Sequence, residues 1–365
     1  MFDRRTMLLG PLALAGCRRR KGSGFPGYAF VANQEGQAVA AVDLTTFTLA
    51  RHIRVEGTPT QVVAHQARVF ALTAENCTVH EISAPELAFR RRTRVGRTAV
   101  SMRLAPQGGG LWVLCREPGQ LVRVPPEEGV LARIDLPAEP ADFDLSSDGR
   151  WAAVSFGAAG SLAFADLVEG RCQAPVMVGR PVSRVRFRFD SKVLLAGSAE
   201  ERTLSILEAP AGRLLVRLPL AVQPESFCFK SDGGQLFITG AGMDAVVIVY
   251  PYSTEIAETV LAGKAPGAMA ASATYLFVAN PPTRDVTILD IETRRAIAVA
   301  AVGDDPGFIT LTPDEQYALV LNRRSGDMAV IRLATITAKR ARSAPLFTMV
   351  PVGSRPVSAA VCGIS

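Results

Sequence analysis

The chain has 365 residues, with 40 lysines and arginines against 34 aspartates and glutamates. Six of the basic residues and one acid lie in the first 21 positions, so the remainder holds 34 basic and 33 acidic residues. A nucleic-acid-binding domain needs a net basic footprint on its folded surface. The near-neutral body therefore argues against a nucleic-acid partner.

The first residues are typical of a bacterial export signal. Arg4 and Arg5 form a charged start, and the apolar run from Met7 to Gly16 is too short to cross a bilayer. The run ends in Leu14-Ala15-Gly16-Cys17, which resembles the lipobox of bacterial lipoproteins. This resemblance implies removal of residues 1–16 and lipidation of Cys17. A plain signal peptide with a chance cysteine is the alternative. The arginine pair also loosely resembles a twin-arginine signal, so Sec and twin-arginine export both stay open.

A basic spacer follows the cysteine. Residues 18–21 are Arg-Arg-Arg-Lys, and residues 22–24 are Gly-Ser-Gly, which is a flexible composition. The basic run would lie against anionic lipid head groups, or it is simply a solvated spacer. We expect a signal peptide over residues 1–16, a tether over 17–27 and one domain over 28–365. The protein would then be anchored through its lipid in the cell envelope, on the periplasmic side or the outer surface.

A unit of about 40 residues returns roughly eight times between Tyr28 and Cys362. A fixed period of this length indicates a repeat architecture. Most copies open with a loop proline, and Thr98 stands in its place in one copy; the prolines are Pro59, Pro140, Pro181, Pro224, Pro266, Pro306 and Pro356.

Each copy is expected to contain four short strands. In chain order, the first strands cover residues 61–64, 100–104, 142–145, 184–187, 226–229, 268–273 and 308–311. In the clearest copy the other strands cover residues 275–280, 286–290 and 295–299, with a turn at 281–284. Four strands in about 40 residues, without a helical apolar period, indicate one blade of a propeller.

The two ends of the chain are expected to share a blade. Residues 353–361 repeat the loop and first strand and then stop, whereas Tyr28 begins at a second strand. Pairing 357–361 with 28–33 would hide both sheet edges and close the ring. Seven internal copies and this shared one predict eight blades. Seven blades is the alternative, because the interval from Pro306 to Pro356 is long; we expect a surface loop at residues 335–345 within it.

Three segments resemble the "YVTN" signature of the YVTN/YncE-like β-propellers: Tyr28–Asn33, Tyr275–Asn280 and Tyr317–Asn322. Residues 42–46 and 289–293 resemble the "V-I-D-x-x-T" element of that family. The resemblance covers residues 28–362 and weakens around 94–134 and 177–218. It implies an all-β propeller of four-stranded blades.

In such a ring, the loops from fourth to first strands share one face with the loops from second to third strands. Loops on a rigid scaffold often carry function. This face, called the loop face below, is predicted to bind a partner protein or a small anionic ligand through Arg97, Arg180, Asp304, Asp305, Arg323 and Arg355. An ordinary solvated surface is the alternative for each residue. Asp304 and Asp305 could also contact Ca²⁺, although two adjacent carboxylates are a weak signal.

The five cysteines after Cys17 are scattered and include no C-x-x-C pair: Cys77, Cys115, Cys172, Cys228 and Cys362. Cys228 and Cys362 lie in or beside apolar strands, where a cysteine acts as a small hydrophobic residue. One disulfide among the other three is open in an oxidising compartment, and the sequence does not select it.

Catalytic patterns are scarce. The chain has three histidines, His52, His65 and His80, and contains no G-x-S-x-G, H-E-x-x-H or Walker loop. We predict no catalytic residue, metal or cofactor, and interpret His65 as a turn residue. The favoured function is a monomeric, non-catalytic scaffold that binds an envelope protein or a cell-wall component. A lactonase-like hydrolase is an alternative, since lactonase propellers resemble this family. An accessory subunit of an exported redox system is the other.

Overall fold

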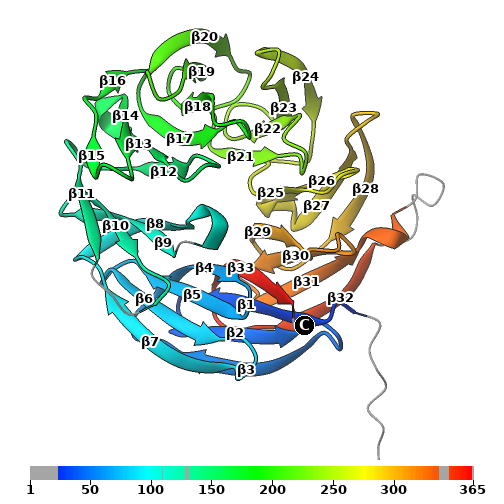
Figure 1. The fold of residues 1–365 in the computed structure, drawn as a ribbon. Coiled ribbons are helices and arrows are strands. Elements are labelled where there is room, and N and C mark those ends of the chain that lie inside the picture. The colour runs from blue at the N-terminus through cyan, green and yellow to red at the C-terminus, as the bar shows by residue number, and fades with distance from the viewer. Residues whose placement is uncertain (1–23, 109, 128–130, 337–344, 364–365) are drawn as a thin grey trace, which may run out of the picture.

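The computed structural model of the protein describes residues 24–108, 110–127, 131–336 and 345–363. Within those ranges, eight antiparallel sheets stand around a common centre as the blades of a ring (Figure 1). The predicted eight-bladed all-β propeller is confirmed, and the seven-bladed alternative is wrong. The expected signal peptide, Cys17 and most of the tether lie outside the described residues.

The strands of each blade run outward from the centre of the ring (Figure 1). Blade 1 combines β33 (Pro356–Gly363), β1 (Gly27–Asn33), β2 (Ala38–Asp43) and β3 (Thr48–Arg54). Blade 2 holds β4 (Pro59–His65), β5 (Arg68–Thr73), β6 (Thr78–Ser83) and β7 (Ala88–Arg94). Blade 3 holds β8 (Thr98–Leu104), β9 (Leu111–Glu117), β10 (Gln120–Val124) and β11 (Ala132–Asp135). Blade 4 holds β12 (Asp142–Leu145), β13 (Trp151–Phe156), β14 (Ser161–Asp166) and an outer edge split into β15 (Arg171–Cys172) and β16 (Val176–Met177).

The second half of the ring repeats this order. Blade 5 holds β17 (Val182–Phe187), β18 (Val193–Ser198), β19 (Thr203–Glu208) and β20 (Arg213–Pro219). Blade 6 holds β21 (Ser226–Phe229), β22 (Leu236–Thr239), β23 (Ala245–Tyr250) and β24 (Glu255–Leu261). Blade 7 holds β25 (Met269–Ala271), β26 (Tyr275–Asn280), β27 (Asp285–Asp290) and β28 (Arg295–Ala301). Blade 8 holds β29 (Pro306–Leu311), β30 (Tyr317–Asn322), β31 (Asp327–Arg332) and β32 (Leu346–Pro351).

The ring closes through blade 1, as the sequence predicts. The C-terminal strand β33 pairs antiparallel with β1, with Tyr28 opposite Cys362 and Ala32 opposite Ser358. Both ends of the chain therefore have their sheet edges covered. Strand β1 ends at Asn33 on the loop face, so it starts, at Gly27, on the opposite face of the ring.

The apolar core lies between neighbouring blades. Phe30 of blade 1 packs in one cluster with Val62 and Val69 of blade 2. On the other side of blade 1, Val31 packs in one cluster with Leu319 of blade 8. The middle strands are buried on both faces because each blade is covered on two sides, which explains their nearly continuous apolar sequences.

The structure refines several predicted boundaries. Pro59, Pro306 and Pro356 begin inner strands instead of lying in loops, since a proline is tolerated as the first residue of a strand. The weak copies around residues 94–134 and 177–218 form complete four-stranded blades. Short 3₁₀ turns occur at η1 (Pro106–Gly108), η2 (Gly157–Ala159), η3 (Pro281–Thr283) and η4 (Leu333–Thr335). In the described ranges we find no helix long and apolar enough to span a membrane.

Candidate binding site on the loop face

The predicted site residues lie in the expected classes of loop. They occupy the connections β7–β8 (Arg97), β16–β17 (Arg180), β28–β29 (Asp304 and Asp305), β30–β31 (Arg323) and β32–β33 (Arg355). The structure brings only some of them together. Arg97 and Arg180 are exposed at the entrances to blades 3 and 5, and Asp304 forms an ion pair with Arg284 of blade 7, with 3.0 Å between Oδ1 and Nε.

The other three predicted residues line one hollow of about 650 Å³ at the seam between blades 8 and 1. These are Asp305, Arg323 and Arg355. The hollow, called the seam pocket below, is completed by Glu35, Arg324, Ser325, Gly326, Pro351, Gly353 and Ser354. Half of the predicted set therefore converges on one place, and that place is where the ring closes.

Main-chain hydrogen bonds fix the loops around the seam pocket. The amide of Arg323 donates to the carbonyl of Asp305 at 2.9 Å. The amide of Val352 donates to the carbonyl of Gly326 at 3.0 Å, and the amide of Gln34 donates to the carbonyl of Arg355 at 2.9 Å. Four loops from two blades are thus joined to one another. The backbones of these loops are held in place before a ligand arrives, which lowers the entropic cost of binding.

The asparagine of the "YVTN"-like segments stabilises these loops. Asn33 Nδ2 donates to the carbonyl of Val352 at 2.6 Å. Gly353 has a φ of 123°, and a Cβ on it would approach Asn33 Nδ2 to 2.7 Å, so this position requires glycine. In blade 8, Asn322 Nδ2 donates to Asp327 Oδ1 at 2.6 Å. The asparagine of these segments therefore stabilises the loops by hydrogen bonds from below the surface.

The seam pocket carries mixed charge with a cationic excess. Arg323 Nη2 lies 2.8 Å from Asp305 Oδ1, and Arg355 Nη1 lies 3.4 Å from Glu35 Oε1. Arg324 is exposed and has no ion pair within the described part of the chain. Arg323 Nε is enclosed without a hydrogen-bond partner there. Guanidinium groups present several donors in a plane and match carboxylate or phosphate oxygens.

Sequence reasoning did not select Glu35, Ser325 or Ser354 as site residues. The signal that could have found them was the predicted ring closure. Pairing 357–361 with 28–33 places residues 353–355 beside the loop that follows Asn33, and Glu35 lies in that loop. The ion pair between Glu35 and Arg355 is a direct consequence of that register.

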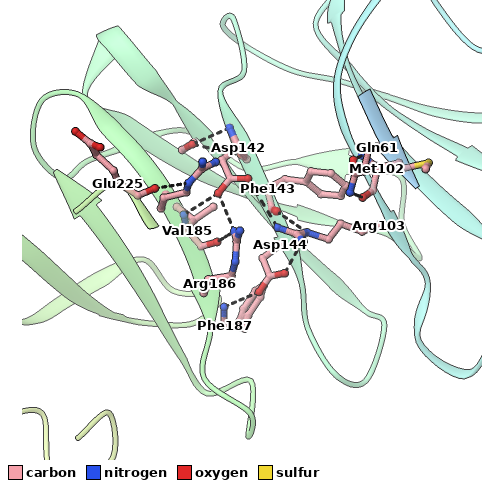
Figure 2. Close-up of polar contacts among 12 residues, drawn as sticks. Gln61, Met102, Arg103, Asp142, Phe143, Asp144, Val185, Arg186, Phe187 and Glu225 are labelled. Carbon is pink, nitrogen blue, oxygen red and sulfur yellow. Dashed lines mark hydrogen bonds and ion pairs between the residues drawn. The ribbon is translucent and has the colours of Figure 1, made fainter. Parts of the chain in front are cut away.

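A second polar cluster lies on the inner strands of blades 3, 4 and 5 (Figure 2). Arg186 Nη1 is 2.7 Å from Asp142 Oδ2, and Arg103 Nε is 3.5 Å from Asp144 Oδ1. The same two carboxylates accept hydrogen bonds from main-chain amides of β17 at 3.2 and 2.9 Å. The inner-strand cluster therefore contains two positive and two negative charges, and it joins three blades.

The pKa shifts in this cluster follow from burial and neighbouring charge. Burial lowers the pKa of Arg103, and the positive charge of Arg186 acts in the same direction. Burial also acts against the charge of Arg186, but Asp142 and Asp144 outweigh it and raise its pKa. The sequence did not predict this cluster, because its members come from three repeats and each repeat alone resembles an ordinary strand.

The histidines are separated from one another. His52 is exposed on β3, and His65 is half-buried at the end of β4, in place of the predicted turn. His80 is buried on β6 with Nε2 3.2 Å from Thr73 Oγ1, and burial lowers its pKa. Across the described ranges, no group of three or more His, Cys, Asp or Glu side chains could hold a metal ion.

Comparisons with known proteins establish the fold. No family model and no curated protein matches the chain. Among solved structures, "Dihydro-heme d1 dehydrogenase NirN in complex with DHE" aligns with a TM-score of 0.74 at 16% identity, over 96% of this chain and 78% of that one. A functionally unknown protein from Desulfotomaculum acetoxidans aligns with a TM-score of 0.65 at 10% identity, over 93% of this chain and 100% of that one. The Kuenenia stuttgartiensis hydrazine synthase aligns with a TM-score of 0.56 at 15% identity, over 88% and 99% of the two chains. At these identities the similarity concerns the fold, so the chain is an eight-bladed β-propeller similar to these structures.

Proposed function

We propose that the protein is a YVTN/YncE-like propeller, exported and anchored in the bacterial envelope through Cys17, that acts as a non-catalytic binding scaffold. The sequence signatures and the lipobox-like segment support its family and location. The observation that carries the binding role is the seam pocket, where three arginines stand against two acids on a fixed frame.

The chemistry of the seam pocket favours an anionic group. Arg324 can reach a ligand without first breaking an ion pair, because it forms none within the described residues. The pairs at Arg323 and Arg355 are partly exposed and can exchange a carboxylate of the protein for one of the ligand. The ligand is a carboxylate or phosphate group, carried by an envelope protein, a cell-wall component or a small molecule.

The test is crosslinking in intact cells followed by mass spectrometry of the material that purifies with the tagged protein. The variant carries Arg324→Glu and Arg355→Glu, which reverses the charge of the seam pocket. The matched control carries Arg51→Glu and Arg295→Glu, which change the net charge equally. Arg51 and Arg295 are exposed on the outer strands β3 and β28.

We expect one dominant partner that is recovered with the wild type and the control and is lost with the seam-pocket variant. If the partner is a small anion, no protein is enriched, and calorimetric titration with the anion shows binding that only the seam-pocket variant loses. Equal recovery and equal anion binding by both variants would overturn the assignment of the seam pocket.

An accessory role in an exported redox system is the second candidate. It is favoured by the aligned structures named as a dehydrogenase and as hydrazine synthase. A haem iron needs a side-chain ligand. Among the described histidines, His52 lies on an outer strand, His65 is half-buried at the end of β4 and His80 is enclosed in its blade. In this candidate the seam pocket would bind a redox enzyme, and recovery of such an enzyme as the crosslinked partner would favour it.

A further inference from the structure

Two enclosed cysteines meet at the interface between blades 2 and 3. Cys77 lies in the turn between β5 and β6, and Cys115 lies on β9, 38 positions further along the chain. Their sulfur atoms are 3.2 Å apart, and neither residue has solvent-accessible surface. They belong to one apolar cluster, together with Val95 and Val113.

The backbone directs the sulfur of Cys77 toward the neighbouring blade. Cys77 has a φ of 48°, and its carbonyl accepts a hydrogen bond from the amide of Val95 at 2.9 Å. Gln37, Arg202 and Arg284 also have positive φ in the corresponding turns of blades 1, 5 and 7. Those turns carry long polar side chains, whereas blade 2 has a small thiol that points inward.

We propose that Cys77 and Cys115 form a disulfide that links blades 2 and 3 beneath the loop face. A disulfide has its sulfur atoms about 2.05 Å apart, so they must approach each other by about 1 Å. Small side-chain rotations supply that movement, because both thiols already face each other. Of the three cysteines that the sequence left open, the structure therefore selects this pair.

The contact shifts the pKa values of the two thiols in opposite directions. The hydrogen-bond contact with Cys77 lowers the pKa of Cys115, and the charge of Arg133 acts in the same direction. The same contact raises the pKa of Cys77. Exchange takes place before this contact has formed, so either thiol can attack first.

The oxidant is a disulfide of the form RSSR, such as oxidised glutathione or the active-site disulfide of an exported thiol oxidase. The thiolate of one of the two cysteines attacks one sulfur of RSSR and releases RS⁻, which gives a mixed disulfide. The thiol of the other cysteine then loses its proton and attacks the sulfur of the first, which releases the second RS⁻. The two protein thiols lose two electrons and two protons, and RSSR becomes two RSH.

Access decides when this exchange occurs. Both sulfur atoms are enclosed once blades 2 and 3 have packed, so exchange takes place while the chain folds in an oxidising compartment. Burial then protects the bond from reductants. The other cysteines lie elsewhere: Cys172 is on the outer edge of blade 4, and Cys362 Sγ donates to the carbonyl of Gln66 at 2.7 Å.

The test uses the full chain, expressed with its own export signal and recovered from the envelope. Free thiols are alkylated under denaturing conditions, and unreduced peptides are mapped by mass spectrometry. We expect a crosslinked peptide pair containing Cys77 and Cys115. The matched control Cys172→Ser should keep this pair, and Cys77→Ser should leave Cys115 alkylated. Alkylation of both thiols in the exported wild type, or a bond from either of them to Cys172, overturns the proposal.

A second measurement does not depend on a variant. Wild-type protein is refolded from the reduced, denatured state with a glutathione redox pair or with excess reductant. Closing a loop of this length should raise the melting temperature of the oxidised form by about 5 °C. Equal melting temperatures and alkylation of both thiols after oxidative refolding contradict the proposal.

Discussion

The ion pair between Asp142 and Arg186 offers a quantitative test of how the inner strands hold the ring together. Asp142 is 3% exposed, and Arg186 approaches it to 2.7 Å from the next blade. We choose Asp142→Asn because the amide keeps the volume and can still accept the hydrogen bond from the amide of Val185. We choose Arg186→Met because methionine keeps much of the aliphatic stem. Each variant removes one charge.

The expected magnitude follows from burial. Removing one partner of a buried ion pair costs about 3 to 5 kcal/mol. The side chain of Arg186 retains 21% exposure, which places the cost near the lower limit, at about 3 kcal/mol. An unfolding entropy of about 2.1 cal/mol/K per residue, over roughly 330 folded residues, converts this to a fall in melting temperature of about 4 °C.

The assay is a double-mutant cycle by urea unfolding. The double variant has no unpaired charge at this position, so it should be more stable than the sum of the single losses by about 2 kcal/mol. The matched control is the pair of Glu208 and Arg213, which is exposed on the outer side of blade 5. Its coupling energy should stay below about 1 kcal/mol. Equal coupling energies at the two pairs would refute the inference that burial makes the inner-strand pair strong.

Two further predictions concern acid stability and anchoring. Burial alone would raise the pKa of Glu81, but hydrogen bonds from Arg68 and Arg91 outweigh it and hold the pKa below its usual value of 4.5. Because the pKa of Glu81 is lower in the folded state, this group stabilises the protein at pH values above 4.5, and this stabilisation is lost as the pH falls through the folded-state pKa. The difference in urea midpoint between wild type and Glu81→Gln should thus be largest near pH 7 and become smaller below pH 4.5. A difference that is constant with pH contradicts this. Separately, Cys17→Ser should move the protein from the membrane fraction to the soluble fraction and abolish palmitate labelling, whereas Cys172→Ser should change neither; labelling that persists in Cys17→Ser excludes the lipid anchor.

The fold was largely predictable because its repeats are local. Each blade carries its own loop, turn and strand pattern, and the same pattern is divided between residues 353–361 and Tyr28. The period therefore revealed both the number of blades and the closure. Exact strand limits were less accessible: the first strand of blade 7 was predicted over residues 268–273 and is Met269–Ala271. Before this strand, the amide of Gly267 donates a hydrogen bond to the carbonyl of Ala279, outside the regular pairing of β25 with β26.

The candidate site was predictable only in part, because a site of this kind depends on which loops meet. The loop classes were identified from the sequence, and all six residues lie in them. Their pairing was not: Asp304 turns to Arg284 of blade 7, whereas its neighbour Asp305 turns to Arg323 of blade 8. The contact between Cys77 and Cys115 likewise depends on packing between two repeats, which no pattern within one repeat encodes.

The direction in which the chain enters β1 determines how an anchored ring would face its surroundings. Gly27 pairs with Gly363 on the side away from the loop face. The seven residue steps from Cys17 to Gly24 reach at most about 25 Å. A lipid on Cys17 would thus hold the opposite side toward the bilayer and leave the seam pocket directed outward. A partner would then approach from the aqueous side of the envelope, and the membrane itself would set the orientation of the encounter.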